Sequence, residues 1–343
     1  MRPASPQICS EAELDAYRAP GADGRLAHTV SALLRQQRAT WPRLAEAQAR
    51  FEAGFLSRLL RVNGFPVRVQ HNRDRMMNVA AKVDAASIAE RPCFLCPANL
   101  PPEQRGVAFG SSFVILCNPA PLFSQHLTIV HAAHVPQRLA GSIDDLLALT
   151  EALGPEFAVL YNGPRSGASA PDHLHFQAGA WADLPLSEWM AGTERMAGAE
   201  IAAAPAPWGC LALRSADRAR AAALLRQALA LLAARESAAQ AEPGVNLAAR
   251  WADGRWLIVL FPRRGHRPAC YFIEDEQQRI MISPGAADLA GIVIVPRPID
   301  WQRVNAEIVQ DIFAEVAIDG AAAAQLAARL AQAMPRFRDG GDR

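Results

Sequence analysis

The chain has 343 residues, a formal net charge of +1 at pH 7 and 51% hydrophobic residues. This length allows two cores or one large one. The weak net charge argues against nucleic acid as a partner, and no apolar run approaches the roughly 20 residues that cross a membrane. The N-terminal segment lacks the apolar stretch of a secretory signal, so we expect a cytoplasmic protein whose six cysteines stay reduced.

The first predicted elements are helical. Residues 26–62 carry apolar residues at helical spacing, as in LAEAQARFEAGFLSRLL, and predict one or two amphipathic helices. From about residue 66 the pattern changes to short β-rich runs, FPVRVQ, FVILCN and HLTIV, bounded by Pro, Asn and Gly. SIDDLLALTEAL then predicts a helix that its serine can cap, and FAVLYNG and HLHFQAG predict two further strands.

The second half has a similar alternation. Residues 214–238 predict a long helix, apolar runs from GVNLAARWADGRWLIVLFP to GIVIVPRP follow with a hairpin at ADG, and helices near 303–316 and 319–334 close the chain. Because HLTIVHAAHVPQ and WLIVLFPRRGHRP both place a histidine after an apolar strand, we expect two α+β halves built alike. The predicted divisions are an N-terminal helical segment 1–65, a first half 66–200 and a second half 201–343.

The segment PDHLHFQAG, residues 171–179, contains an alternating polar pattern. In a β-strand, alternate side chains share one face, so His173, His175 and Gln177 form a polar row while Leu174 and Phe176 point into the core. Such a row is unfavourable unless each member has a partner. The structural alternative is a pair of hydrogen-bonded histidines on a half-exposed strand, but three aligned polar residues favour a functional role.

A neutral imidazole in this row is a good nucleophile toward phosphorus. One ring nitrogen attacks when the other donates its proton to an acceptor such as a backbone carbonyl, and the amide N–H of Gln177 can hold a phosphoryl oxygen. Upstream, NGPRSGAS offers Arg165, Ser166, Ser169 and backbone N–H groups such as that of Gly167 as a phosphate cradle. Taken alone, this loop would be interpreted as a plain Gly/Ser turn.

Cys93 and Cys96 have the C-x-x-C spacing at which two thiolates reach one Zn²⁺ ion. There is no second C-x-x-C, so histidines must complete such a site, and the candidates are His126, His131, His134 and His173. A redox pair is the rival interpretation, although the flanking sequence lacks a thioredoxin-like βαβ pattern. A pair of buried structural thiols is the third interpretation.

A basic cluster follows a predicted strand in the second half. FPRRGHRP contains Arg263, Arg264, His266 and Arg267, which could bind an acceptor phosphate or a sugar phosphate through charge-assisted hydrogen bonds. A solvated basic turn is at least as good an interpretation of this segment.

These motifs together resemble a known superfamily. CFLCPAN followed by an H-x-H-x-Q strand resembles the branch of the histidine-triad superfamily that contains galactose-1-phosphate uridylyltransferase. GASAPDHLHFQA is more similar to the GDP-hexose phosphorylases, which act on GDP-L-galactose or GDP-D-glucose, and diadenosine tetraphosphate phosphorylase is a further relative. NPAPLFSQHLTIVHAAHV resembles the earlier strand-to-helix segment of the superfamily. The resemblance covers roughly residues 90–180 and implies an α+β fold with an antiparallel sheet, a first histidine-triad-like half and a degenerate second half.

The resemblance also implies roles for individual residues. His175 would attack the α-phosphorus and carry the nucleotidyl group, Gln177 would hydrogen-bond the phosphoryl oxygens, and Ser169 and Asn162 would contact phosphate or nucleotide. The uridylyltransferase pattern implies a zinc site at Cys93, Cys96, His134 and His173. The strand reads H-L-H-F-Q rather than the H-P-H-x-Q of the uridylyltransferases, and the zinc ligands do not carry over from the hexose phosphorylases, which share this strand.

We therefore expect a nucleotidyltransferase of the phosphorylase type. An NDP-hexose, such as a GDP-hexose, would lose its leaving group to His175, phosphate or a sugar phosphate would accept the nucleotide, and zinc would be structural. A hexose-1-phosphate nucleotidyltransferase and a dinucleoside polyphosphate phosphorylase are the alternatives in the same class. A zinc-stabilised nucleotide-binding protein without turnover and a zinc-dependent hydrolase stay open, as does a homodimer, and neither nucleic acid nor membrane is an expected partner.

Overall fold

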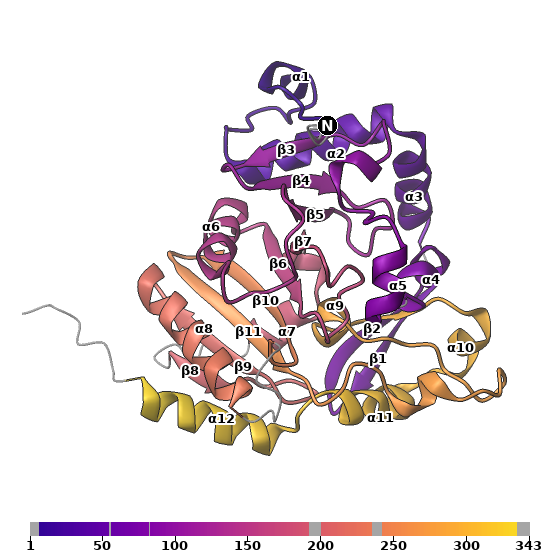
Figure 1. Ribbon diagram of the computed structural model, residues 1–343, viewed down its shortest axis with the longest axis vertical. Coiled ribbons are helices and arrows are strands. Elements are labelled where there is room, and N and C mark those ends of the chain that lie inside the picture. Colours follow the sequence, from indigo (N-terminus) through magenta and orange to yellow (C-terminus); the bar gives the residue numbers. More distant parts are fainter. Residues whose placement is uncertain (1–6, 55, 82, 192–199, 235–241, 335–343) are drawn as a thin grey trace, which may run out of the picture.

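The computed structural model describes residues 7–334 except 55, 82, 192–199 and 235–241. Its larger sheet is antiparallel and runs through the centre of the molecule (Figure 1). In spatial order its nine strands are β3 (Gly106–Phe109), β4 (Phe113–Cys117), β5 (His126–His131), β7 (His175–Ala180), β6 (Phe157–Asn162), β10 (Val245–Ala252), β11 (Arg255–Pro262), β9 (Leu211–Ser215) and β8 (Ile201–Ala203). The α+β class with an antiparallel sheet is thus confirmed.

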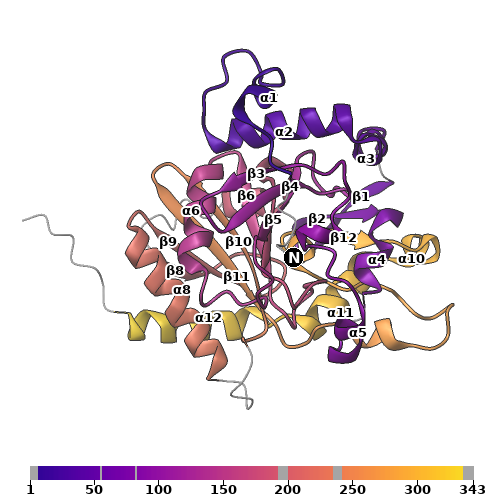
Figure 2. The same ribbon diagram turned by 45° about the horizontal axis from the view of Figure 1, so that its top comes forward.

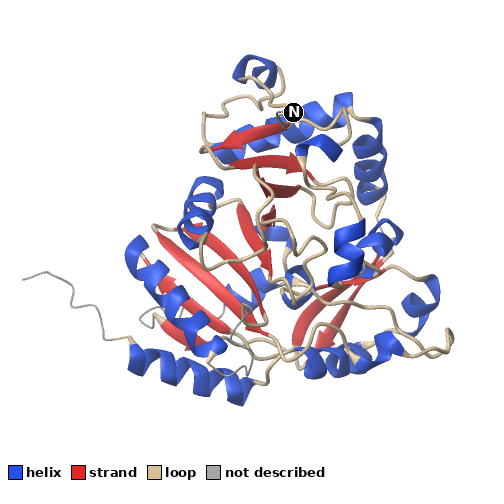
Figure 3. Ribbon diagram, in the orientation of Figure 1, coloured by secondary structure: helices blue, strands red, loops and turns tan. Residues whose placement is uncertain are grey.

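A smaller sheet packs beside the larger one (Figure 3). Its three strands, in spatial order, are β1 (Ser57–Val62), β2 (Phe65–His71) and β12 (Ile292–Val295). β1 and β2 are antiparallel, whereas β12 runs parallel to β2 and so brings the second half of the chain back to the first. Every described residue of β4 is buried, which is typical of a strand that is covered on both faces.

Two large hydrophobic cores lie on the two faces of the larger sheet, and a smaller cluster that includes Cys93, Leu95 and Leu116 lies beside β4 and β5. The helices that contribute most residues to the first core are α2 (Leu26–Thr40), α6 (Ile143–Leu153), α8 (Arg218–Ala233) and α12 (Gly320–Ala333), and Leu14 and Leu44 of two further helices also belong to it. The second core contains the smaller sheet with α7 (Leu186–Ala191), α9 (Ala286–Leu289), α10 (Pro298–Arg303) and α11 (Ala306–Val316). The remaining helices are α1 (Glu11–Asp15), α3 (Pro42–Glu52), α4 (Met76–Val79) and α5 (Ala85–Glu90). None of the described helices has both the length and the apolar character needed to cross a bilayer.

One strand order occurs twice in the larger sheet. The segment β4-β5-α6-β6-β7 has the spatial order 4-5-7-6, and the segment β8-β9-α8-β10-β11 has the order 8-9-11-10. The two halves meet where β6 pairs with β10, and these two strands are equivalent to each other in the repeat. This repeat matches β7 with β11 and β5 with β9. The similar sequences HLTIVHAAHVPQ and WLIVLFPRRGHRP therefore come from strands that are not equivalent.

Most predicted elements are confirmed, including α6, the described part of the 214–238 helix, the β10–β11 hairpin and the two closing helices. Residues 235–238 of that helix lie outside the described residues.

The prediction of helix up to residue 62 is wrong, because Ser57–Val62 forms β1. Asn63 and Gly64, with φ of 49° and 84°, form the turn to β2, and cross-strand pairing overrides the apolar spacing of this segment. The predicted divisions at residues 65 and 200 stay predictions.

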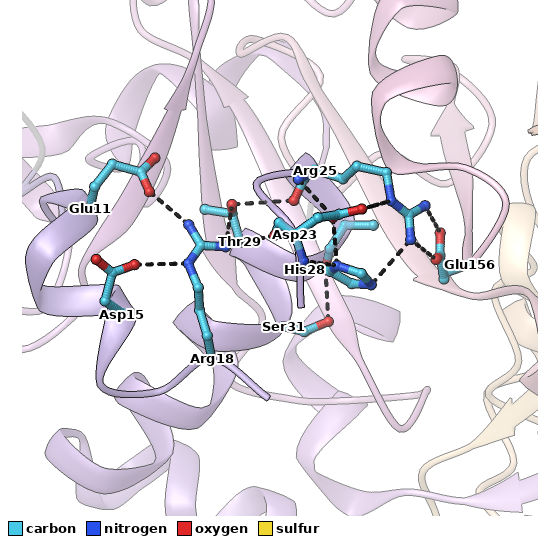
Figure 4. A network of polar contacts seen from close by, with 10 residues as sticks. Glu11, Asp15, Arg18, Asp23, Arg25, His28, Thr29, Ser31 and Glu156 are labelled. Carbon is cyan, nitrogen blue, oxygen red and sulfur yellow. Dashed lines mark hydrogen bonds and ion pairs between the residues drawn. The ribbon is translucent and has the colours of Figure 1, made fainter. Parts of the chain in front are cut away.

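The N-terminal helices are held against the first half of the sheet. Figure 2 shows α1, α2 and α3 together beside β3 and β4. Figure 4 shows the polar contacts of this region: Arg18 pairs with Glu11 at 2.7 Å, and Arg25 pairs at 3.1 Å with Glu156, which immediately precedes β6. Exposed ion pairs contribute about 0–1 kcal/mol each, so the buried apolar face of α2 provides most of the attachment.

Candidate active site

His175 begins β7 and is 5% exposed. Together with Gln177 it lines a cavity of about 360 Å³. Leu174 and Phe176 are buried in the core on the other face of the sheet, as the alternation predicts. His173 precedes the strand and its ring lies beside Cys93 and Cys96, so only His175 and Gln177 of the polar row lie at the cavity.

Hydrogen bonds fix the tautomer and the backbone position of His175. Its Nδ1 lies 2.8 Å from the carbonyl oxygen of His173, which can only accept, so Nδ1 carries the proton. Oε1 of Gln137 accepts from the His175 backbone N–H at 2.7 Å, and Nε2 of Gln137 donates to the carbonyls of His175 and Asn162. Burial lowers the pKa of His175 to about 4. Near neutral pH the residue is therefore a neutral imidazole whose Nε2 carries no proton, which is the nucleophilic form.

The four residues implied as metal ligands lie together. Sγ of Cys93 is 3.3 Å from Nδ1 of His173, and Sγ of Cys96 is 3.1 Å from Nδ1 of His134 and 3.6 Å from Nδ1 of His173. All four ligand atoms lie within 4.8 Å of one another. Tetrahedral zinc with usual bond lengths would separate sulfur and nitrogen ligands by about 3.5 Å, so the donor set and spacing fit such an ion.

Neighbouring acceptors orient both histidines of this cluster. Nε2 of His173 lies 2.7 Å from the carbonyl oxygen of His131, and Nε2 of His134 lies 3.4 Å from a carboxylate oxygen of Asp172. These partners favour the proton on Nε2 and leave each Nδ1 available to a metal ion. Of the four candidate histidines, His131 therefore contributes through its backbone, and His126 lies elsewhere, against Gln177.

A second cavity of about 50 Å³ adjoins the first, and both are lined by Arg75, Asn78, Ser169 and Gln177. The larger cavity has apolar walls that include Met77, Phe94, Leu95, Leu100 and Pro119. The smaller cavity is polar, and the second half of the chain supplies His266, Arg267, Ser283, Gly285 and Asp288 to its lining. The two halves of the chain therefore build one composite site around Gln177.

The predicted phosphate cradle is only partly at these cavities. Asn162, Gly167 and Ser169 line the polar cavity, and Oγ of Ser169 lies 3.5 Å from Nδ2 of Asn78. Ser166 is fully buried and lines neither cavity, and Arg165 donates to the carbonyl oxygen of Glu242 at 3.3 Å.

Only part of the basic cluster of the second half lines the polar cavity. His266 and Arg267 line the polar cavity, and Nε of Arg267 donates to Oγ of Ser283 at 3.0 Å. Arg263 is buried, and its guanidinium donates to Asn246 and to the backbone carbonyls of Val316, Pro284, Gly265 and His266. Arg264 pairs at 2.8 Å with the exposed Asp319. Arg263 thus supports the cavity wall, and Arg264 lies outside the cavity lining.

Several residues of the site were not predicted from the sequence, and four of them have polar side chains with a clear place in it. Gln137 holds the backbone around His175, and Arg75, Asn78 and Asp288 line the polar cavity. The final residue of HLTIVHAAHVPQ is Gln137, and a polar residue that follows a predicted strand of the site was the one available signal. The other three reach the cavity only through long-range packing.

Comparisons with known proteins agree with this geometry at the level of the fold. Residues 33–180 match a family described as a domain of unknown function, DUF4922, which spans less than half of the chain. No curated protein matches the sequence. The structure is similar to yeast Ap4A phosphorylase Apa2, with a TM-score of 0.56 and 15% identity over 81% of this chain and 97% of that one.

Two further solved structures are similar. Apa2 in complex with AMP has a TM-score of 0.51 and 14% identity, over 83% of this chain and 96% of that one. A GalT-like protein from Arabidopsis thaliana has 13% identity over 75% of this chain and 98% of that one, but its TM-score of 0.33 is too low to support an argument. The chain thus has the fold of the yeast phosphorylase, in agreement with the histidine-triad and uridylyltransferase-like architecture that its motifs indicate.

Proposed function

We propose that this protein is a nucleotidyltransferase that forms a covalent nucleotidyl intermediate on His175. The observation that carries the proposal is the state of this imidazole. Its Nδ1 donates a hydrogen bond to the carbonyl oxygen of His173 at 2.8 Å, the ring is neutral near neutral pH, and the residue lines a cavity. In the first step Nε2 forms a bond to the α-phosphorus, the bond from phosphorus to the leaving oxygen breaks, and its electron pair leaves with that oxygen. In the second step an oxygen of phosphate or of a sugar phosphate attacks, and the electron pair of the P–N bond returns to the imidazole.

The charges around Gln177 support an anionic substrate. Arg75 is buried and lines both cavities, and its Nε has no hydrogen-bond partner among the described residues. Burial lowers the pKa of this guanidinium to about 10, so it stays charged near neutral pH. A buried cation between the cavities would stabilise phosphate groups that extend from one cavity to the other.

The two cavities favour a nucleoside diphosphate hexose as the substrate. The apolar walls of the larger cavity, where Phe94 is 46% exposed, suit a nucleobase. The polar cavity offers Ser283, His266 and Arg267 to hydroxyl or phosphate groups, and no Phe, Tyr or Trp among the described residues lines it for a second base. A dinucleoside polyphosphate is the second candidate, because the similar yeast structure is an Ap4A phosphorylase.

We propose zinc as the ion at Cys93, Cys96, His134 and His173, with a structural role. Four protein ligands would leave no open position for a reacting water, which argues against a hydrolytic metal centre. When bound, the ion would fix the segment before His175, whose carbonyl oxygen at His173 holds the proton of the nucleophile.

Intact-protein mass spectrometry tests the function. The protein is mixed briefly with a panel of NDP-hexoses and dinucleoside polyphosphates and is denatured at neutral pH, because phosphorus–nitrogen bonds are labile in acid. We expect a mass gain of one nucleoside monophosphate, loss of that gain on adding phosphate, and no gain in His175→Gly. The matched control is His71→Gly, which removes a half-buried imidazole that lines neither cavity. Nucleotide binding without a mass gain in the wild type would favour the non-enzymatic alternative, a nucleotide-binding protein.

A further inference from the structure

His126 is a fully buried histidine whose ring lies against Gln177 of the candidate site. It begins β5, which pairs directly with β7, and its ring lies between the loop before β5 and the Gln177 side chain. Nδ1 of His126 accepts the backbone N–H of Leu122 at 3.1 Å. A backbone N–H can only donate, so this Nδ1 carries no proton, and the proton of the neutral ring is on Nε2.

This tautomer determines the orientation of the neighbouring amide. Nε2 of His126 lies 2.9 Å from Oε1 of Gln177 and donates to it. The NH₂ group of Gln177 is then turned away from His126, and the side chain lines both cavities. A flipped amide would place an N–H of Gln177 against the N–H of His126 and its oxygen toward the cavity, where it would repel phosphoryl oxygens.

Burial keeps this arrangement in a single state. It lowers the pKa of His126 to about 3, and the positive charge of Arg75 acts in the same direction. The ring therefore stays neutral at physiological pH, and its second tautomer would lose the hydrogen bond from Leu122. The backbone N–H of Leu122 thus sets the His126 tautomer, and that tautomer sets the Gln177 amide.

We infer that His126 is a positioning residue that aims the N–H groups of Gln177 at the phosphoryl group during transfer to His175. The orientation of the Gln177 amide is argued from the hydrogen bonds alone, and its effect on phosphoryl transfer rests on the proposed function. His126 touches no reacting atom and acts through Gln177 alone. Its role differs from that of Gln137, which holds the backbone around His175 rather than a side chain.

Paired variants separate positioning from folding. His126→Leu removes both the acceptor for Leu122 and the donor to Gln177, whereas the side chain in His126→Gln still has an amide N–H that can donate to Oε1 of Gln177. Removal of one aimed donor costs roughly 10²–10³-fold in rate, so Gln177→Ala sets the maximum loss. We expect His126→Leu to lose about tenfold or more of the rate of adduct formation, within that maximum, and His126→Gln to recover most of it.

A double variant supplies a readout that a purely structural role would not change. If His126 acts only through Gln177, His126→Leu combined with Gln177→Ala should be no slower than Gln177→Ala alone. A structural defect would instead multiply the two losses. A multiplied loss, or a His126→Gln variant as slow as His126→Leu, would overturn the inference.

A second measurement does not depend on turnover or on variants. In wild-type protein with ¹⁵N-labelled histidine and glutamine, two-bond proton–nitrogen spectra should show the His126 proton on Nε2. Inorganic phosphate should shift the side-chain amide signal of Gln177. A proton on Nδ1, or a Gln177 amide that phosphate does not shift, would contradict the inference. If the wild type forms no adduct, the proposed function fails while these spectra still decide the orientation.

Discussion

Gly167→Ala tests whether the loop before His173 is held by the second half of the chain. Gly167 has a φ of +94°, and a Cβ placed there would lie 3.1 Å from both Cα of Gly285 and the carbonyl oxygen of Pro284. A side chain in the left-handed region costs about 1–2 kcal/mol, and overpacking against backbone adds about 1–3 kcal/mol. We therefore expect Gly167→Ala to lower the free energy of unfolding by about 2–5 kcal/mol, measured by urea denaturation.

Gly64→Ala is the matched control for this prediction. Gly64 also has a positive φ, +84°, but an added Cβ would meet nothing within 4 Å. Its loss of stability should be limited to the backbone strain of about 1–2 kcal/mol. Equal losses in the two variants would refute the packing argument. Under conditions where both variants stay folded, only Gly167→Ala should slow adduct formation, because Ala286 next to Gly285 donates to Oδ1 of Asn162 at 2.7 Å.

Three further predictions concern the proposed metal cluster and a half-buried carboxylate. Cys96→Ser should lower zinc affinity by more than about tenfold, whereas Cys270→Ser, outside the cluster, should leave the zinc content measured by mass spectrometry unchanged. Tyr161→Phe should lower the free energy of unfolding by about 1.5–3 kcal/mol in urea denaturation, because the hydroxyl donates to Oε1 of Glu242 at 2.5 Å. Burial raises the folded-state pKa of Glu242 above its unfolded value of about 4.3, so its contribution to stability is present below that value and is lost as the pH rises through the folded pKa. Glu242→Gln should flatten this decline in urea denaturation series at several pH values, and an unchanged slope would contradict the assignment.

The chemistry of the site was predictable where it depends on short spacing. The H-x-H-x-Q and C-x-x-C patterns place functional groups within a few residues, so strand alternation and ligand reach can be worked out from the sequence alone. His175 and Gln177 do share the cavity face of β7. The choice of His134 over His131 came from the resemblance, because spacing alone left both open.

The walls of the site could not be predicted in this way. Arg75 and Asp288 are more than two hundred positions apart, and the parallel pairing of β2 with β12 in the smaller sheet brings their segments together at the polar cavity. The role of Arg263 was also beyond local reasoning, because three of its five acceptors are distant in sequence: Asn246 in β10, Pro284 in a loop and Val316 at the end of α11. By contrast, β1 could have been predicted, since the Asn63–Gly64 pair is a strong signal for a hairpin turn.

The structural repeat explains why a half without its own histidine strand remains necessary. β10 pairs with β6 along its edge, and Val245 accepts the backbone N–H of Gly163 at the start of the loop that leads to His173. The segment after β11 then returns to the first half and supplies His266, Arg267 and Ser283 to the polar cavity. A chain that ended before β10 would leave β6 with an unpaired edge and would lack one wall of the site. In the proposed function the second half would therefore act on the substrate through its loops, while the first half would supply the nucleophile and the ligands of the proposed metal ion.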